Sequence, residues 1–308
     1  MRFQNLNSFN PFNTRIGLAL GGGAAKGVAH IGALKALQEE GIDVDCISGT
    51  SIGAFVASYY AFGKSIDEMR EVALNLTFKS MASFSWKASG GLFSTDAVRE
   101  MLIRDLGDAQ IEDAQIPLSI AATDICTGEQ VVFNSGSVAD AVCASVAVPG
   151  LFAPVEVQGR KLVDGGIIEN VPVSLLKPMD AGIIIAINLS GNRRYATPKS
   201  TADSFSNAID ICIDHKTNEQ LKQADIILNL DLTDYSRADN RPHTDELINE
   251  GYKAMMDKAK SAKQLKRVSL IRYIIRLARE VIPLKIPHII SRFYEAKNKL
   301  INIGQKNS

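Results

Sequence analysis

Short apolar runs alternate with stretches of helical spacing along most of this chain. Residues 15–20 form an apolar run that ends in consecutive glycines, and residues 28–40 then place apolar side chains at the spacing of one helix face. A second apolar run, residues 44–47, leads into another helical stretch, residues 52–62. A strand followed by a helix, twice in succession, predicts a mainly parallel sheet with helices packed over it.

The rest of the chain continues the same alternation. Further strands are predicted at residues 118–123, 130–134, 161–163, 182–189 and 226–230. Further helices are predicted at residues 65–76, 95–106 and 138–146. Polar and turn-forming residues cluster at 197–202 and 232–242, which we expect to be loops.

The overall composition is that of a globular protein, but its charges are unevenly distributed. With 308 residues, 46% of them hydrophobic, the chain is long enough to bury a large core. Residues 258–308 contain 13 Lys/Arg and two Asp/Glu, a net charge of +11, although the formal charge of the whole chain is zero. We therefore divide the chain into an acidic body, residues 15–257, and a basic tail, residues 258–308.

Cysteine usage and hydropathy bear on the cellular compartment. Residues 1–14 lack the apolar core of a signal peptide. The uncharged stretch 46–63 contains three glycines, so we interpret it as strand, turn and helix and not as a membrane span. We expect a cytoplasmic protein whose cysteines are small buried residues, forming neither a zinc site nor disulfides, because they are far apart and make no C-x-x-C pair: Cys46, Cys126, Cys143 and Cys212.

The sequence GTSIG, residues 49–53, places Ser51 between two glycines where a predicted strand meets a predicted helix. In such a nucleophile elbow the chain turns sharply, and Gly49 and Gly53 remove side chains that would collide. The serine hydroxyl is then held at the N-terminus of a helix, which favours the oxyanion formed when serine attacks a carbonyl. Ser51 is therefore the candidate nucleophile.

The glycine block GGGAAKG, residues 21–27, follows the first predicted strand. It lacks the Gly-Lys-Ser/Thr ending of a phosphate-binding P-loop, and its sixth position is Lys26, where a dinucleotide fingerprint needs glycine. An oxyanion loop, in which backbone N–H groups approach a developing negative charge, fits this block better. A tight turn without a ligand is the alternative.

A serine nucleophile needs a base, and histidine is the usual partner. His30 lies in the helix after the glycine block and His288 in the basic tail, so both are poor candidates. His215 and His243 follow a possible acid in the Ser, Asp, His order of α/β-hydrolases, and this triad stays open on sequence order alone.

Asp164 is a different kind of candidate base. It ends an apolar run and is followed by Gly165 and Gly166, and the ends of strands are where sites assemble in α/β sheets. A partly desolvated carboxylate is more basic, so Asp164 could take the serine proton directly. A simple Asp-Gly turn is the alternative interpretation.

Four sequence blocks occur in one order over roughly residues 15–230: LGGGAAKGVAHIG (20–32), GTSIGA (49–54), ASVAVPGLFAP (144–154) and DGG (164–166). Together they resemble a bacterial member of the patatin-like phospholipase family. The resemblance implies a three-layer α/β/α sandwich and a Ser51–Asp164 dyad without a catalytic histidine. It also implies that the glycine block supplies oxyanion N–H groups from Gly21, Gly22 and Gly23, with motif support from Lys26, Gly27, Gly49, Gly53, Gly165 and Gly166.

The activity implied by this resemblance is hydrolysis of a fatty-acyl ester in a phospholipid or lysophospholipid. Ser51 would attack the ester, Asp164 would pass its proton to the leaving alcohol, and water would release the fatty acid, without a metal or organic cofactor. The third block would shape one wall of the site, where Ser145 is either a supporting hydroxyl or a packing residue. Two alternatives remain: a lipid acyltransferase using the same intermediate, and a non-catalytic lipid-binding regulatory protein.

The basic tail shows helical apolar spacing at residues 268–282 and again at 288–301. Apolar spacing with an excess of Lys and Arg predicts C-terminal basic amphipathic helices that bind an anionic membrane surface, here the inner membrane face. A helical pair folded onto the acidic body is the alternative. No nucleic acid is expected, because no base-reading motif accompanies the basic residues. Nothing in the sequence indicates an oligomeric state.

Overall fold

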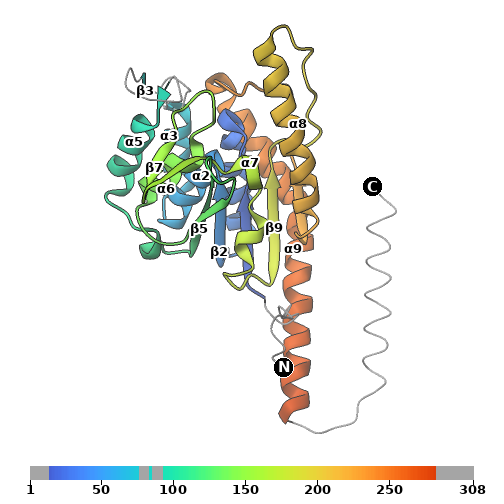
Figure 1. Cartoon of the computed structure of the whole chain (residues 1–308). Helices are drawn as coiled ribbons and strands as arrows, with labels where there is room; N and C mark the ends of the chain where they lie inside the picture. Colours follow the sequence, from blue (N-terminus) through green and yellow to red (C-terminus); the bar gives the residue numbers. More distant parts are fainter. Residues whose placement is uncertain (1–13, 76–82, 85–92, 282–308) are drawn as a thin grey trace, which may run out of the picture.

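The computed structural model describes residues 14–75, 83–84 and 93–281, and a mixed sheet flanked by helices forms the centre of this part of the chain (Figure 1). The strands of this sheet are β1 (Ile16–Leu20), β2 (Cys46–Thr50), β5 (Leu118–Asp124), β6 (Gln130–Phe133), β7 (Val155–Val157), β8 (Arg160–Asp164), β9 (Ile183–Asn188) and β10 (Ile226–Asn229). Their order is β10-β9-β1-β2-β5-β8-β7, with β6 beside β5. The first five of these are parallel neighbours, whereas β6 and β8 run antiparallel to β5, and β7 antiparallel to β8.

The helices between residues 29 and 146 follow the predicted positions closely, whereas the last helix begins well before the one predicted at 268–282. The helices of the described residues are α1 (Ala29–Glu39), α2 (Ile52–Ala61), α3 (Ile66–Asn75), α5 (Asp96–Leu106), α6 (Val138–Val146), α7 (Gly166–Glu169), α8 (Thr201–Leu221) and α9 (Thr244–Val281). Shorter 3₁₀ turns are η1 (Ala24–Val28), η2 (Ile111–Asp113), η3 (Val173–Leu176) and η4 (Arg241–His243). The loop expected at 197–202 ends early, because the Ser200 side chain accepts the N–H of Asp203 and begins α8. A separate two-stranded pair, β3 (Ser83–Phe84) with β4 (Phe93–Ser94), was not predicted.

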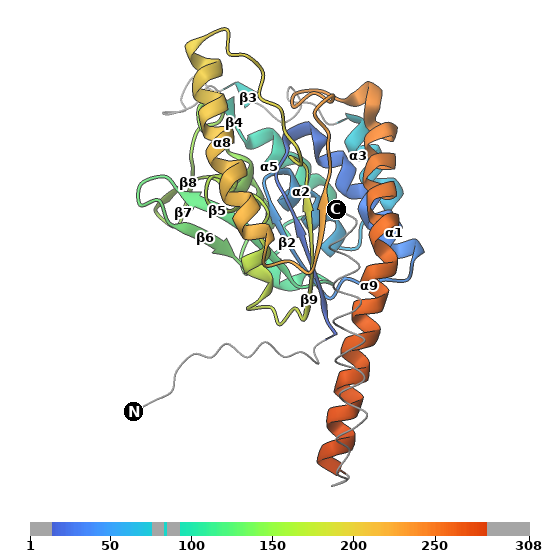
Figure 2. The same cartoon turned by 90° about the vertical axis from the view of Figure 1, so that its right-hand side faces the viewer.

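Both faces of the central strands are buried, which makes the fold a three-layer sandwich. In β1, Leu18 and Leu20 belong to the core under α1, α2, α6 and α9, whereas Ala19 between them packs with Leu176 and Leu221 on the side of η3 and α8. A strand covered on both faces reads as a continuous apolar run, which is why the period-two pattern is absent. Figure 2 shows α8 and α9 on opposite sides of the sheet. The predicted three-layer α/β/α fold is confirmed.

Helix α9 crosses α1 at two glycines. A Cβ atom on Gly32 would lie 1.7 Å from the carbonyl oxygen of Ile248, and one on Gly251 would lie 1.8 Å from that of Ala29. The helices therefore approach to backbone contact, which only glycine allows at these two positions.

The division placed at residue 258 falls inside α9, which continues without a break from the body into the basic tail. Ala259 and Ala262 are buried, and Lys263 pairs with Glu40 of the body, so the first turns of the tail pack on the body. The predicted helix at 268–282 lies in α9 as far as Val281, and the later turns extend beyond the sheet (Figure 1). The helix predicted at 288–301 lies outside the described residues. In the described ranges, no helix has the length and hydropathy needed to cross a membrane.

The cysteines differ from the expectation in two of four cases. Cys46 and Cys143 are buried, as expected. Cys126 and Cys212 are exposed, because Cys126 lies in the turn after β5 and Cys212 on an outward position of α8. The expectation of four buried cysteines was therefore wrong for these two residues.

Candidate active site

Ser51 occupies the sharp turn between β2 and α2, with φ 55° and ψ −127°. Residues other than glycine rarely adopt a positive φ, so the serine is held in a strained conformation. Both flanking glycines are required by close approach: a Cβ on Gly53 would lie 2.1 Å from the oxygen of Leu20, and one on Gly49 would lie 2.5 Å from the Cα of Ala54. The turn has the geometry of a nucleophile elbow.

The sheet register brings Asp164 to the same level as Ser51. Thr50 of β2 pairs with Ala121 of β5, and the next residue of β5, Ala122, pairs with Asp164 at the end of β8. The Ser51 hydroxyl donates a hydrogen bond to the Asp164 carboxylate. The N–H of Gly166 donates a second one to Asp164 Oδ1 at 2.7 Å. The two predicted dyad residues therefore meet, and both are buried.

Burial raises the pKa of Asp164 to about 6. The hydrogen bonds from Ser51 and from the N–H of Gly166, together with the positive charge of Arg237, oppose this rise. A carboxyl group with a pKa near 6 is ionised at neutral pH and is still a stronger base than an exposed aspartate. Asp164 therefore has the basicity that proton transfer from Ser51 requires.

The glycine block lies directly against Ser51, since a Cβ on Gly22 would be 3.3 Å from the Ser51 Cβ. Its backbone N–H groups are not equivalent. Gly21 donates to the oxygen of Ile187 and Gly22 to that of Asn170, each at 3.0 Å. Among the described residues, no acceptor faces the N–H of Gly23. Of the three glycines that we expected to bind an oxyanion, Gly23 has the N–H group available for it.

The third sequence block supports the dyad through α6. Ser145 Oγ accepts the N–H of Ser51 at 2.8 Å, and the N–H of Asp164 donates to the oxygen of Ala147 at 2.9 Å. Ser145 thus contacts the backbone of Ser51. This block holds both Ser51 and Asp164 by hydrogen bonds.

Residues 169–172 form a structural support that sequence reasoning missed. The carbonyl oxygen of Glu169 accepts the hydroxyl of Thr50 at 2.9 Å, and that of Pro172 accepts the hydroxyl of Ser48 at 2.8 Å. The intervening carbonyl, that of Asn170, accepts the N–H of Gly22. This segment therefore joins the end of β2 to the glycine block. The only sequence signal for it was its closeness to Asp164.

The three histidines in the described ranges do not serve Ser51. His30 is buried, its Nε2–H donates to the oxygen of Gly21 at 2.8 Å, and burial lowers its pKa to about 4. His215 is exposed on α8, and His243 pairs with Glu246 at 2.9 Å. His30 therefore holds the glycine block in place. His288 lies outside the described residues.

Two cationic side chains lie close enough to the site to influence it. Lys26 is half-buried, and burial together with the charges of Arg193 and Arg237 lowers its pKa. The backbone of Arg237 accepts the N–H of Ala25 at 3.1 Å, while its exposed guanidinium pairs with Asp210 at 2.7 Å. Across the described residues, no three His, Cys, Asp or Glu side chains gather as they would around a metal ion.

Comparison with known proteins agrees with this geometry. Residues 18–177, just over half of the chain, match the family model for patatin-like phospholipases. An NTE family protein of Mycobacterium tuberculosis is 39% identical over 199 residues, which are 61% of this chain and 54% of that protein. A lysophospholipase of Emericella nidulans is 35% identical over 206 residues, 62% of this chain and 13% of that protein.

The chain thus spans about half the length of the mycobacterial relative and a small part of the fungal one. Among solved structures, VipD from Legionella pneumophila has a TM-score of 0.47 at 16% identity, over 80% of this chain and 67% of that chain. The type III effector protein ExoU has a TM-score of 0.43 at 14% identity, over 82% of this chain and 53% of that chain. On the match of residues 18–177 and the four sequence blocks, the chain belongs to the patatin-like phospholipase family.

Proposed function

We propose that this chain hydrolyses the fatty-acyl ester of a phospholipid or lysophospholipid through an acyl intermediate on Ser51. The hydrogen bond from the Ser51 hydroxyl to a buried, basic Asp164 carries the proposal. A strained serine at a strand-to-helix turn, next to a carboxylate of raised pKa, is suited to nucleophilic attack on a carbonyl. Membership of the patatin-like phospholipase family supports the choice of a lipid ester.

The reaction proceeds in two steps. Ser51 Oγ attacks the carbonyl carbon while Asp164 takes the hydroxyl proton, and collapse of the tetrahedral intermediate breaks the ester bond as Asp164 returns the proton to the leaving alcohol. Water then attacks the acyl-Ser51 ester while Asp164 accepts its proton, and Asp164 returns that proton to Ser51 Oγ as the bond between Ser51 and the fatty acid breaks. The N–H of Gly23 and the positive end of α2 stabilise the oxyanion in both steps.

Lys26 and Arg237 favour a substrate that carries a phosphate. Lys26 is half-buried among positive charges, and burial first, followed by the charges of Arg193 and Arg237, lowers its pKa. Lys26 lies within the glycine block, and Arg237 is tied to that block through Ala25. An anionic headgroup would pair with both cations next to the reacting ester.

The basic segment beginning in α9 would bring the enzyme to a membrane surface that contains anionic lipids. Lys258, Lys260 and Arg267 are exposed on the described part of this helix. Each Lys or Arg near an anionic surface contributes about 1 kcal/mol of attraction, so a segment with a net charge of +11 is a strong attractant. The enzyme would then be peripheral on the inner membrane face.

The test is hydrolysis of p-nitrophenyl acetate and of lysophosphatidylcholine by the wild type, Ser51→Ala and Asp164→Asn. A fluorophosphonate probe should label the wild type on Ser51, which mass spectrometry of the peptide detects. Loss of turnover in both variants with retained lipid binding supports the hydrolase. Full turnover by Ser51→Ala would overturn it, and lipid binding without any wild-type turnover or labelling would indicate a binding protein.

A further inference from the structure

The glycine block leaves few backbone donors for an oxyanion. The peptide between Gly21 and Gly22 is held at both ends, because its oxygen accepts the Nε2–H of His30 and its N–H donates to the oxygen of Asn170. Of the N–H groups of the three consecutive glycines, that of Gly23 alone has no acceptor among the described residues. Oxyanion sites combine several preorganised donors, which can be backbone N–H groups or side-chain amides. A further donor is therefore expected next to this block.

The side chain of Asn170 lies against the glycine block and has no partner. Asn170 is 7% exposed, and no described residue forms a hydrogen bond with its side-chain amide. Neither polar atom of the amide is closed off from solvent, so a bound substrate can reach it. Buried polar groups normally have hydrogen-bond partners, because losing water without gaining a partner is unfavourable. We therefore expect the partner of this amide to come with the substrate.

Two glycines from separate sequence blocks make room for this amide. A Cβ on Gly22 would lie 2.6 Å from Asn170 Oδ1 and 3.3 Å from the Cβ of Ser51. A Cβ on Gly166 would lie 3.1 Å from the same oxygen and 3.0 Å from Asp164 Oδ1. The amide thus lies where the glycine block meets the turn that carries Asp164. Since Oδ1 is the end that lies against the glycines, Nδ2 is the end left to donate.

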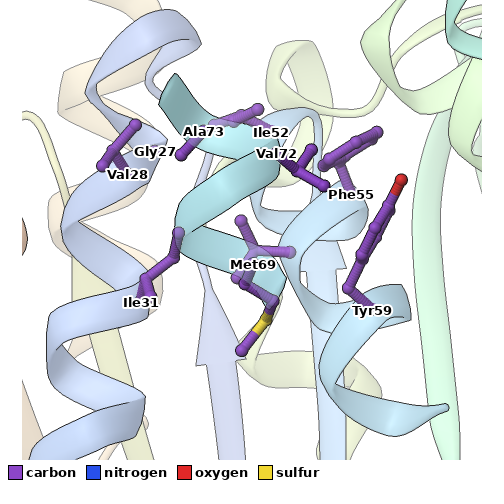
Figure 3. A pocket seen from close by; sticks show the side chains of 10 residues that line it. Gly27, Val28, Ile31, Ile52, Phe55, Tyr59, Met69, Val72 and Ala73 are labelled. Atoms are coloured by element: carbon purple, nitrogen blue, oxygen red, sulfur yellow. The ribbon is translucent and has the colours of Figure 1, made fainter. Parts of the chain in front are cut away.

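The side of the turn at Ser51 that faces α1 and α3 offers no such donor. Figure 3 shows an apolar pocket there, whose lining includes Ile52, the residue after Ser51. The only hydroxyl of that lining belongs to Tyr59 and donates to Asp105 at 2.6 Å. A side-chain donor for the ester therefore has to come from the side of the glycine block, where Asn170 lies.

We propose that the side-chain amide of Asn170 is a catalytic donor, which binds the oxyanion at Ser51 together with the N–H of Gly23. The inference rests on the proposed function, because it assumes that an ester reacts at Ser51. As Ser51 Oγ attacks, the carbonyl oxygen gains negative charge and accepts a hydrogen bond from Asn170 Nδ2–H. When the carbonyl forms again, that hydrogen bond weakens, so the amide stabilises the transition state more than the bound ester. The proton still passes between Ser51 and Asp164.

The experiment measures kcat and KM at pH 8 for p-nitrophenyl acetate and for the thionoester in which sulfur replaces its carbonyl oxygen, after circular dichroism has shown each variant to be folded. Asn170→Ala removes the amide but keeps the backbone oxygen that holds Gly22. It should lower kcat for the ester about 100-fold with little change in KM, the usual effect of removing one oxyanion donor. The ester-to-thionoester ratio of kcat/KM should fall at least about tenfold, because sulfur is a weak hydrogen-bond acceptor.

A second variant and a control complete the comparison. Asn170→Asp keeps the size of the side chain but has no N–H to donate at pH 8, so its kcat for the ester should fall at least as far. Asn188→Ala is the matched control. Asn188 is similarly buried, but its Nδ2 donates to Asn229 Oδ1 at 3.0 Å and its Oδ1 accepts the N–H of Ser190 at 3.1 Å. This control should lose stability and keep both the wild-type kcat and the wild-type ratio.

An ester-to-thionoester ratio that stays at the wild-type value in Asn170→Ala would overturn the assignment, because a misplaced Ser51 would slow both substrates alike. A wild-type kcat in Asn170→Ala or Asn170→Asp would overturn it as well. Both results leave the proposed function standing as long as the wild type hydrolyses the ester. No hydrolysis by the wild type would count against the proposed function itself, and the role of Asn170 would fall with it.

Discussion

The side chain of Ser145 accepts the backbone N–H of Ser51 at 2.8 Å and donates its own proton to the oxygen of Ala121 at 2.6 Å. The first hydrogen bond fixes the peptide that precedes the nucleophile, at a residue whose positive φ is unfavourable without such restraint. The second fixes the Ser145 hydroxyl itself, so that its lone pairs face Ser51. Ser145 is therefore a positioning residue for Ser51, the proposed nucleophile.

Ser145→Ala should leave the buried N–H of Ser51 without an acceptor. We expect a loss of about 1–3 kcal/mol in the free energy of unfolding, measured in urea, because an unpaired buried donor keeps its full desolvation penalty. The kcat for a soluble ester should fall at least tenfold with little change in KM, because orientation and not binding is lost.

The matched control is Ser58→Ala on α2. Ser58 is equally buried, but its hydroxyl donates to the oxygen of Ala54 within the same helix, and no donor depends on it. Its kcat should stay at the wild-type value. If Ser145→Ala and Ser58→Ala have the same kcat, Ser145 does not position the nucleophile.

The pH dependence of the reaction should report Asp164. Since this carboxylate must be ionised to accept a proton and its pKa is about 6, kcat/KM for a soluble ester should fall about tenfold per unit below pH 6. Arg237→Gln should move this inflection to higher pH, because the positive charge of Arg237 lowers the pKa of Asp164. An inflection that stays in place would show that the profile reports another group.

The raised pKa of Asp164 also makes the stability of the folded protein depend on pH. The folded-state pKa of about 6 lies above the ordinary value of 3.8, so the folded protein holds this proton more tightly and loses stability as the pH rises from about 4 to about 6. Asp164→Asn removes the charge. The difference in free energy of unfolding between Asp164→Asn and the wild type, measured in urea, should shift in favour of the variant by up to about 3 kcal/mol between pH 4 and pH 8. A pH-independent difference would contradict a raised pKa.

Gly53→Ala should be far more damaging than an alanine at an ordinary turn glycine. Its Cβ would lie 2.1 Å from the oxygen of Leu20, which belongs to the strand backbone and cannot move aside. We expect a loss of more than about 4 kcal/mol in the free energy of unfolding, as for the most destabilising substitutions in a protein core. Gly128→Ala is the control: Gly128 has φ 73° but no atom within 4 Å of the new Cβ, so only the backbone strain of about 1–2 kcal/mol applies. Urea unfolding of both variants tests the difference, and equal losses would refute it.

Arg237→Gln should weaken hydrolysis of phosphate-bearing lipids selectively. At pH 8, where Asp164 is ionised with or without Arg237, kcat/KM for lysophosphatidylcholine should fall about tenfold relative to that for a monoacylglycerol. Arg241→Gln is the matched control: Arg241 pairs with Asp239 at 2.7 Å much as Arg237 pairs with Asp210, but it is the charge of Arg237 that acts on Asp164 and Lys26. Equal losses on both lipids, or an equal effect of the control, would exclude headgroup recognition by Arg237.

A chain that ends after Arg267 tests the membrane role of the tail without disturbing the body. This truncation keeps Ala262 and the pair of Lys263 with Glu40, but removes eight Lys/Arg residues and two Asp/Glu residues. Sedimentation with vesicles that contain phosphatidylglycerol should fall by more than tenfold, while hydrolysis of p-nitrophenyl acetate stays at the wild-type rate. Binding at the full level after truncation would favour a tail that packs on the body.

Local signals account for what could be predicted of the fold. Strands β1 and β9 are buried on both faces and therefore read as continuous apolar runs, and α6 was predicted with its observed bounds because its apolar spacing is regular. Strand β7, Val155–Val157, has three residues that are not fully buried, so no such run marks it. Its place is decided by pairing with β8, a contact that the local sequence does not encode.

The candidate site likewise has one part that the local sequence predicts and one part that depends on contacts between distant residues. Ser51 and Asp164 could be proposed as site residues because the glycines next to each of them indicate a tight turn. The support given by residues 169–172 could not, because it depends on hydrogen bonds with Ser48 and Thr50 at separations of 124 and 119 residues. Likewise, the N–H groups of Gly21 and Gly22 are occupied by partners from β9 and Asn170, which spacing within the glycine block cannot reveal.

The glycine crossing of α1 and α9 has a consequence for how the molecule assembles. Helix α1 continues directly from the glycine block, yet its outer side is covered by a helix from the other end of the chain, and Lys263 and Glu40 are 223 residues apart. Contacts between residues so far apart in the sequence form late, because the long loop between them must close first. During synthesis, the layer that carries the glycine block stays uncovered until α9 has left the ribosome. The turn at Ser51 is thus complete once Ser145 and residues 169–172 have been made, whereas the layer behind the glycine block has to wait for α9.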